Sequence, residues 1–436
     1  MGDAMFDRSV LLFGFAVTAT AAWGAGFQII PTVNAVGRYM AGNGIAGDEI
    51  GDLYFNPASS SLQSKSTCEA GFIFLTIENE FHDKGSRVTA QTPVGPLTRQ
   101  ASGIEDTSSD DGYLVTNFCS FRTRDPRLRV GFGLMPTFGL RSRYDSRWIG
   151  RYHAVDSELV TVNVNPSASY QLTDSLALGA GLSVEYADAK LSQAVFTGFG
   201  NPDGMARVDG EDFGFGYNLG IIWQASRALR LGASFRSKID HTLDGKRKLS
   251  RLGPLNGKID AEAKTTLPET VFISAIYTLP GWSERWRLAA TGRWTNWSRF
   301  DEIRVQFPNG ERDSVAPQGW QDSWSLGLAL DWRIDDRWQA TLGGGVDESP
   351  IPNARLRGPR MPDTDRQFIG AGIVYRPPSA GWSAEFSYHR LFAGDRSVDN
   401  TIDLVPSLPG AITHTLRGRY AADGVDVFGV RGSLSF

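Results

Sequence analysis

The stretch Trp324-Ser325-Leu326-Gly327-Leu328-Ala329-Leu330-Asp331-Trp332 decides the fold class of this chain. Its odd places carry tryptophan and leucine, whereas its even places carry serine, glycine, alanine and aspartate. A period of two residues is the signature of a β-strand with one apolar and one polar face. The same alternation recurs over 176–186, 213–223 and 382–389. The chain is therefore predicted to be an all-β protein.

Two details favour a barrel in lipid over a soluble sandwich, whose apolar faces would turn inward. The predicted strands often reach about ten residues, which suits a tilted membrane crossing of about 9–11 residues. Aromatic residues such as Trp324 and Trp332 stand at strand ends, where a membrane barrel carries its interfacial girdles. The polar faces also carry many charges, which a single packed core could not absorb but a water-containing lumen could. These residues are Glu185, Arg230, Arg236, Arg287, Arg293, Asp331, Glu385, His389 and Arg431.

The connections between the predicted strands alternate between short and long. The short ones lie near 124–126, 173–175, 226–228, 280–284, 335–337 and 377–381, and the long ones near 83–111, 141–157, 192–210, 243–267, 298–320, 348–365 and 394–424. Outer-membrane barrels show this asymmetry between periplasmic turns and extracellular loops. The strand count predicts a fourteen-stranded antiparallel transmembrane β-barrel over residues 67–436. The final strand ends on Phe436, which resembles the assembly signal of outer-membrane proteins.

Composition and charge exclude several other classes of protein. The 436 residues include 44 basic and 48 acidic side chains, a formal charge of -4, and no basic stripe that would favour nucleic acid. The long apolar run Val10 to Ala22 is too short and too near the terminus for a spanning helix. Residues 1–24 are predicted to be a secretory signal peptide, with an uncleaved anchor as the alternative. No cofactor or metal is expected, because no cysteines and histidines cluster with metal-ligand spacing.

Two cysteines, Cys68 and Cys119, lie on strands that are predicted to be neighbours. An exported protein could join them in a disulfide. The sequence does not show whether their side chains point the same way. A disulfide and two unpaired thiols therefore both stay open, with the unpaired thiols favoured.

Residues 25–66 precede the first predicted strand and follow no sustained period. Within them, Asn56-Pro57-Ala58 opens a short helical stretch to Leu62, because Asn suits an N-cap and Pro suits the first helical position. A segment of about forty residues is too small to bury a core of its own. Its many apolar side chains nevertheless argue against a disordered tail. We expect it to fold inside the barrel lumen as a hatch, or plug, of short helices.

Four features, in the same order along the chain, resemble the FadL/TodX family of outer-membrane transporters of hydrophobic compounds. They are Ala25-Gly26-Phe27-Gln28, Asn56-Pro57-Ala58, the run Asn163 to Lys190, and Asp347-Glu348-Ser349-Pro350-Ile351-Pro352 followed by Pro362-Asp363-Thr364-Asp365-Arg366. The resemblance implies a fourteen-stranded barrel with an N-terminal hatch. It also implies passive uptake of hydrophobic molecules, through an outer apolar groove, a lumen pocket and a sideways exit at a kink in the third strand.

The resemblance also assigns roles to particular residues of the hatch and of the third strand. The residues expected to gate the channel within the hatch are Phe27, Gln28, Asn56, Pro57 and Ala58. The lateral opening would lie at Pro136, Phe138 and Gly139. Proline lacks a ladder hydrogen bond and glycine often marks a bulge, so the local chemistry agrees with a kink there. A bulge without any role in transport is the alternative.

Substrate would be bound first by the long loops and then inside the barrel. The apolar loop residues expected to form the outer groove are Phe196, Phe199, Met205 and Leu252. Loops that merely fold on each other are the alternative. Arg304 matches a basic position of the family and would meet a fatty-acid carboxylate. For this residue, an arginine that faces water in the lumen is the alternative.

Rival functions fit the sequence less well than uptake of long-chain fatty acids. An outer-membrane lipase needs a Ser–His pair with an orienting group, yet Ser387 and His389 are only strand neighbours and need not meet. A general porin needs an open lumen, which the hatch would close. An aromatic-hydrocarbon channel of the same family remains the alternative. We therefore expect a non-enzymatic, monomeric, multi-pass protein of a Gram-negative outer membrane, surrounded by outer-membrane lipid and lipopolysaccharide, with no nucleic-acid partner.

Overall fold

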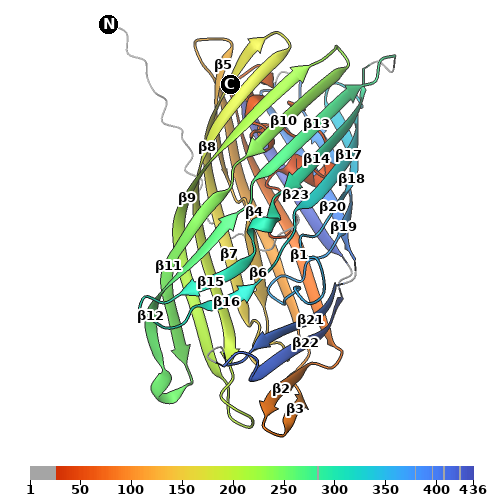
Figure 1. Ribbon diagram of the computed structural model, residues 1–436. Coiled ribbons are helices and arrows are strands. Elements are labelled where there is room, and N and C mark those ends of the chain that lie inside the picture. The colour runs from red at the N-terminus through yellow and green to blue at the C-terminus, as the bar shows by residue number, and fades with distance from the viewer. Residues whose placement is uncertain (1–25, 282–283, 379, 395, 406–407, 422–423) are drawn as a thin grey trace.

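The computed structural model describes residues 26–281, 284–378, 380–394, 396–405, 408–421 and 424–436. Over these residues, fourteen antiparallel crossings form a closed barrel (Figure 1). β1 (Thr67–Asp83) pairs on one side with β4 (Thr107–Arg122) and on the other with β23 (Val425–Ser435), which closes the cylinder. The predicted fourteen-stranded barrel is confirmed. The predicted signal peptide, residues 1–24, lies outside the described residues.

The remaining crossings follow one another around the barrel in chain order. Three of them consist of two strand segments each. These are β5 with β6 (Leu128–Met135, Gly139–Arg143), β10 with β11 (Leu229–Arg236, Ile239–Ser250) and, running the other way, β12 with β13 (Gly257–Leu267, Thr270–Thr278). The others are β7 (Asp156–Thr173), β8 (Leu176–Val195), β9 (Gly204–Gln224), β14 (Trp286–Thr295), β17 (Ser323–Arg333), β18 (Trp338–Asp347), β19 (Arg366–Tyr375) and β20 (Trp382–Ala393).

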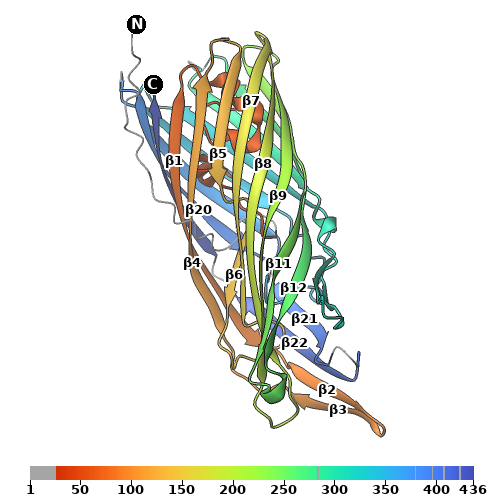
Figure 2. The ribbon, with the colours of Figure 1, turned by 90° about the vertical axis from the view of Figure 1, so that its left-hand side faces the viewer.

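Short turns join the crossings at the end of the barrel that carries the C-terminus, and longer connections join them at the opposite end (Figure 2). We call these the short-turn end and the long-loop end. Additional short elements occupy the long-loop connections. They are β2 (Arg87–Thr92), β3 (Gly95–Gln100), η2 (Gly253–Leu255), η3 (Trp297–Arg299), β15 (Glu302–Gln306), β16 (Ser314–Pro317), β21 (Arg396–Asp403) and β22 (Ile412–Ala421).

Much of what the sequence predicts as loop is strand instead. β8 and β9 stay paired as far as Val195↔Gly204, and β11 and β12 as far as Leu249↔Gly257. Backbone pairing between neighbouring strands continues beyond the length that a membrane crossing requires. The predicted loops 192–210 and 243–267 therefore shrink to 196–203 and 251–256.

The barrel is apolar outside and polar inside, as β17 shows. Trp324, Leu326 and Leu328 are 62%, 46% and 56% exposed, whereas Ser325 and Asp331 are 5% and 1% exposed. A soluble protein would turn these two faces the other way, because burying apolar surface is what stabilises it. An exposed apolar band of this kind requires a lipid environment.

Aromatic residues stand at the strand ends of this outer surface. At the short-turn end, Trp286 stacks on Trp332 at 5.3 Å between ring centroids, and Trp338 lies 4.5 Å from Tyr375. Such rings, with an apolar body and a polar edge, suit the interface between lipid and water.

The hatch lies inside the barrel, toward the short-turn end (Figure 1). It contains α1 (Val33–Arg38), α2 (Asp52–Phe55) and η1 (Pro57–Leu62). As the sequence predicts, Asn56 caps η1, accepting a hydrogen bond from the Ala58 N–H at 2.9 Å, with Pro57 in the first helical position. α1 packs on β19 and β20, and η1 packs on β7 and β8. Among the described residues, none of the helices has the length and apolar character needed to cross a membrane.

The two cysteines form a disulfide, Cys68–Cys119, so the favoured interpretation of two unpaired thiols is wrong. The register of β1 against β4 places Cys68 directly opposite Cys119, with 4.1 Å between their Cα atoms. Side chains that are directly opposite in an antiparallel pair point to the same face of the sheet. The sequence could not fix this register, and a shift of one residue would have sent the two sulfurs to opposite faces.

Candidate functional site

The barrel wall is interrupted at the third crossing. The ladder between β4 and β5 runs from Arg122↔Arg129 to Asn117↔Leu134 and then stops. β6 pairs with β7, from Gly139↔Val160 to Arg143↔Asp156, but within the described residues no backbone ladder joins it to β4. The candidate residues Pro136, Phe138 and Gly139 lie in or next to this break and are buried.

The start of the hatch takes the place of a neighbouring strand at this break. The Ile29 N–H donates to the Thr137 carbonyl at 2.8 Å, and the Gly139 N–H donates to the Phe27 carbonyl at 2.9 Å. Gln28 and Phe138 form an isolated antiparallel bridge between these bonds. The structure thus joins two groups of candidate residues that the sequence places in separate elements.

Phe27 is the centre of an aromatic cluster in the lumen. Its ring centroid lies 4.8 Å from Trp297, 5.2 Å from Phe300, 5.7 Å from Trp320 and 5.8 Å from Phe138. All five side chains are buried, and we call them the Phe27 cluster. Three of its members, Trp297, Phe300 and Trp320, were not identified from the sequence, because they follow strand ends where aromatics also serve as membrane girdles.

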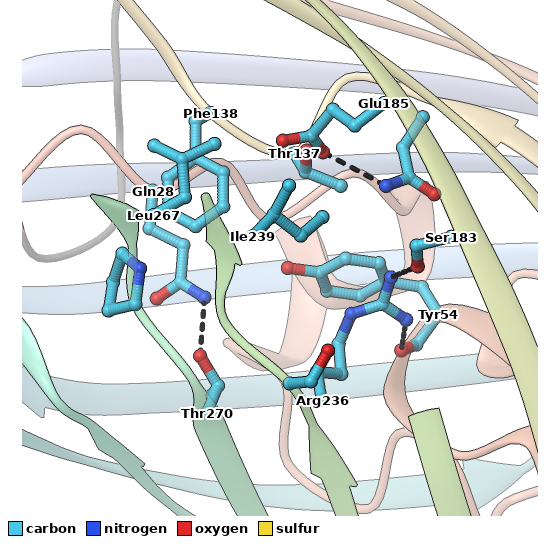
Figure 3. Close-up of a pocket in the computed structure, with 13 residues that line it drawn as sticks. Gln28, Tyr54, Thr137, Phe138, Ser183, Glu185, Arg236, Ile239, Leu267 and Thr270 are labelled. Carbon is cyan, nitrogen blue, oxygen red and sulfur yellow. Dashed lines mark hydrogen bonds between the residues drawn. The ribbon is translucent and has the colours of Figure 1, made fainter. Parts of the chain in front are cut away.

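A small pocket, with a volume of about 350 Å³ including space open to solvent, lies beside the Phe27 cluster, between the hatch and the barrel wall (Figure 3). Phe138, Ile239 and Leu267 form its apolar side. Its other side is polar: Arg236 donates to the Tyr54 carbonyl at 3.0 Å and to the Ser183 hydroxyl at 3.3 Å. Gln28 donates to the Thr270 hydroxyl at 3.2 Å across the pocket.

The predicted outer-groove residues lie at the long-loop end, but they form two contacts rather than one patch. Phe196 and Phe199 pack on each other at 5.4 Å between ring centroids. The Arg99 guanidinium lies 4.8 Å over the Phe199 ring. Leu252 packs against Gly204, next to Met205, at the start of β9.

Arg304 does not line the Phe27 cluster. It lies on β15, where its guanidinium donates to Glu302 at 2.6 Å and to Asp313 at 2.9 Å. Its side chain is 41% exposed. Two carboxylates already pair with this cation, so nothing in its surroundings favours it over other arginines as a partner for a substrate carboxylate.

Buried ion pairs attach the hatch body, the segment from α1 to η1, to the barrel wall. Arg38 of the hatch donates to Asp331 of β17 at 2.5 Å. Asp48 of the hatch pairs with Arg287 of β14, which also contacts Asp331 at 3.0 Å. Asn56 adds hydrogen bonds from its amide to carbonyls of β9 and β10. These contacts join residues more than 160 positions apart in the sequence, and α1, α2 and η1 are held on several sides.

One buried hatch carboxyl makes hatch stability depend on pH. Burial raises the pKa of Asp52 from 3.8 to about 7, although the N–H groups of Gly44 and Gly47 donate to it and oppose the shift. Because the folded-state pKa is raised, the contribution of protonated Asp52 to the stability of the hatch is fully present below pH 3.8. This contribution is lost as the pH rises through about 7. We expect hydrogen exchange of the hatch amides to accelerate across this window, and Asp52→Asn to flatten the change. Equal pH slopes in the two proteins would contradict this.

The residues that a lipase would need are used in packing the hatch. Ser387 donates to Glu385 at 2.8 Å, and the Nδ1 atom of His389 lies 3.0 Å from the Val36 carbonyl. In the described ranges, no three His, Cys, Asp or Glu side chains are grouped so as to hold a metal ion.

The profile of the family described as outer membrane protein transport protein (OMPP1/FadL/TodX) matches residues 15–436. This match includes the hatch, the interrupted third crossing and every strand of the barrel. The chain belongs to this family. Members of the FadL/TodX family are outer-membrane transporters of hydrophobic compounds. The chain is accordingly a multi-pass protein of a Gram-negative outer membrane that transports hydrophobic small molecules, with its short-turn end toward the periplasm.

Individual FadL/TodX proteins are distant in sequence but similar in fold. A long-chain fatty acid transport protein of Escherichia coli strain CFT073 is 24% identical over 406 residues, covering 85% of this chain and 88% of that protein. The crystal structure of a Pseudomonas aeruginosa FadL homologue superposes with a TM-score of 0.83 at 22% identity, covering 94% of this chain and 100% of that one. The Pseudomonas putida toluene transporter TodX superposes with a TM-score of 0.63 at 16% identity, covering 89% and 94%. At these identities the two structures support the shared fold alone.

Proposed function

We propose that this protein is a channel for passive uptake of long-chain fatty acids. Substrate is caught by the apolar loop residues, passes to the Phe27 cluster and leaves sideways through the break between β4 and β6. The observation that carries the proposal is the position of Phe27. Its ring is the centre of the apolar cluster, and its carbonyl accepts a hydrogen bond from Gly139 at the edge of the break.

The proposal assigns the movement to residues 26–30 rather than to the whole hatch. The hatch body is held by buried ion pairs such as Arg38–Asp331, whose rupture would leave charges unpaired away from water. The segment around Phe27 is held by hydrogen bonds and by the ring contacts of Phe27, but by no ion pair of its own. The hydrogen bonds are the two backbone bonds at the break, those of Gln28 with Thr270 and Thr295, one from the Tyr54 hydroxyl to the Ile29 carbonyl, and one from the Gly26 N–H to Asp363. A neutral hydrogen bond contributes only about 0.5–1.5 kcal/mol net, and a bond to a carboxylate about 1.5–3 kcal/mol. A bound apolar molecule that replaces the ring contacts of Phe27 could therefore displace this segment alone.

A lateral exit suits an apolar cargo because the lipid outside the wall is as apolar as the substrate. The edge of β6 beside the break has no backbone ladder to β4, and one contact there is a hydrogen bond from the Arg143 N–H to the Ser108 hydroxyl at 3.1 Å. Opening at this place costs little, since the wall is already without ladder bonds. The barrel encloses its own lumen within a single chain, which supports a monomer surrounded by outer-membrane lipid and lipopolysaccharide.

A reversible staple tests the gate directly. Gln28 and Phe138 form a bridge flanked by its two hydrogen bonds, the narrow type of antiparallel pair, with Cα atoms about 4.5 Å apart. A disulfide spans that distance. In an Escherichia coli strain lacking its own long-chain fatty acid transport protein, we expect the oxidised Gln28→Cys/Phe138→Cys double variant to take up no labelled oleate, and the reduced form to recover uptake.

The staple has matched controls. Each single cysteine variant reports the effect of losing one side chain. The native protein treated with the same reductant reports the effect of opening Cys68–Cys119. Equal oleate uptake by the oxidised and reduced double variant would refute gating by Phe27. Uptake of toluene but not oleate by the native protein would keep the gate and move the substrate to aromatic hydrocarbons.

A further inference from the structure

The outer face of the barrel carries an ordered charge pattern at the long-loop end, where β8, β9, β11 and β12 extend toward the loops (Figure 1). The register of these strands places charged side chains directly opposite one another, in three rows that run across the sheet. From the membrane outward, the first row is acidic, the second alternates in sign and the third is basic. The rows are Glu262, Asp244, Glu211 and Asp188; Asp260, Lys246, Asp209 and Lys190; and Lys258, Lys248 and Arg207.

These three rows face away from the lumen. On β9, the members of the rows share a face with Phe213 and Phe215, whose residues are 61% and 71% exposed. Successive residues of a strand point to opposite faces, and the intervening positions point inward. There, Val208 and Ala261 pack with Phe307 of the connection between β15 and β16. The inner face of the extended strands is therefore covered, whereas the outer face presents its charges outside the barrel.

The cations of the second row already have carboxylate partners. Lys246 lies 3.9 Å from Asp260, on the strand beside it. Lys190 lies 2.7 Å from Asp188 and 3.8 Å from Glu158. Opposite charges that lie directly opposite each other stabilise a sheet. The second row therefore neutralises its own cations and leaves them unavailable to an anion from outside the chain.

The third row, which we call the cationic row, has no such partners. Lys258 lies directly opposite Lys248, and Lys248 lies directly opposite Arg207. All three residues are exposed, and within the part of the chain that the structure describes none of their side chains forms an ion pair or a hydrogen bond. Like charges directly opposite each other destabilise a sheet. An anion from outside the chain would remove this repulsion.

The height of the cationic row above the membrane selects the kind of anion. Arg207 lies six positions (213 to 207) beyond Phe213, the last aromatic residue of the outer band on β9. At about 3.3 Å per residue and a strand tilt of about 40°, the row stands about 15 Å above that ring along the membrane normal. A phospholipid headgroup layer is only about 5–8 Å thick. The acidic row lies at that lower height and repels phosphate there, so direct contact falls to a taller phosphorylated headgroup at the cationic row.

We propose that the cationic row binds the phosphorylated saccharide headgroup of lipopolysaccharide in the outer leaflet. Lysine and arginine donate strong charge-assisted hydrogen bonds to phosphate oxygens, so the charge of the row is complementary to this headgroup. The row also continues the lipid-facing surface of β8, β9, β11 and β12 outward, so the same lipid that covers the apolar band reaches it. This contact does not depend on which molecule the channel transports.

Two matched triple variants test the assignment. Fluorescence anisotropy of labelled lipopolysaccharide with phosphorylated core sugars measures binding to the full, detergent-solubilised protein, with EDTA present so that no divalent cation bridges carboxylate to phosphate. One variant removes the cationic row, and the control removes three cations of the same outer face that already pair with carboxylates. They are Arg207→Gln/Lys248→Gln/Lys258→Gln and Lys190→Gln/Lys246→Gln/Lys264→Gln. We expect the first to bind at least about tenfold more weakly than the native protein, and the control to stay within about threefold of it.

Two further probes define the partner, namely the same lipopolysaccharide without its core phosphates and labelled phosphatidylglycerol. The native protein should bind each of them as weakly as the cationic-row variant binds phosphorylated lipopolysaccharide. Unchanged binding in that variant, or an equal loss in the control, overturns the proposal. Phosphatidylglycerol bound through the cationic row as tightly as lipopolysaccharide would overturn the choice of a taller headgroup. If the triple variant lacks the circular dichroism of the native protein, Lys248→Gln, at the centre of the row, is judged against Lys246→Gln in the same way.

Discussion

A protein in which Arg431 is replaced by methionine is expected to lose about 3–5 kcal/mol of unfolding free energy. Arg431 lies on β23 and pairs with Glu69 of β1 at 2.9 Å, with Glu385 of β20, and with Glu49 of the hatch at 3.7 Å. All four side chains are buried. Methionine fills a similar volume but leaves three carboxylates without the cation they share. The strands that close the barrel and the hatch would both be destabilised, because one guanidinium joins them.

Chemical unfolding of the detergent-solubilised protein, followed by circular dichroism, measures this loss. Arg285→Met is the matched control, because Arg285 is exposed at the short-turn end and the same substitution there removes no buried ion pair. Arg431→Lys keeps the charge but cannot reach all three carboxylates, so its midpoint should fall between those of the native protein and Arg431→Met. Native and Arg431→Met proteins that unfold at the same denaturant concentration would show that these carboxylates are solvated or protonated without Arg431.

The sequence predicted the features of the fold that depend on local pattern. The alternation over Trp324–Trp332 is a property of one strand, and it became an outer apolar face and an inner polar face as predicted. The cap at Asn56 depends on two adjacent residues and was also predicted. In both cases the chemistry that decides the structure lies within a few residues of chain.

The features that the sequence did not predict depend on register between distant segments. The Cys68–Cys119 pairing requires a particular alignment of β1 with β4. Arg360, in a long connection, and Arg396, on β21, meet Gly26 around one cavity only in the folded chain. Arg304 illustrates the converse. An arginine suits a carboxylate site, but this one is already paired with Glu302 on β15 and with Asp313, just before β16. The type of a residue determines which ligands it could bind, but its neighbours in the fold determine whether its donors and acceptors are available to a ligand.

Gly179→Val is expected to convert the closed barrel into one that leaks small solutes. Gly179 faces the lumen on β8, where the backbone of η1 comes very close. A Cβ atom at Gly179 would lie 2.2 Å from the Ala58 nitrogen and 2.4 Å from the Pro57 carbonyl carbon. The backbone of β8 cannot shift to relieve this clash, because it is fixed by its ladders with β7 and β9. The strand would remain, because valine favours β-structure, and the hatch helix would have to move away.

Sugar permeation in proteoliposome swelling assays separates loss of the hatch from loss of the barrel. Gly292→Val is the matched control, since no atom lies within 4 Å of a Cβ at Gly292, and it should stay impermeable. Gly179→Val should admit sugars while retaining the β-sheet circular dichroism of the native protein. A Gly179→Val barrel that stays folded and closed would mean that η1 can shift without unblocking the lumen, and the ion pairs of α1 with the wall would then suffice to seal it. A leak would instead show that closure of the lumen requires η1 as well as α1. A gate confined to residues 26–30 could then admit apolar molecules without admitting sugars only because α1, α2 and η1 stay in place.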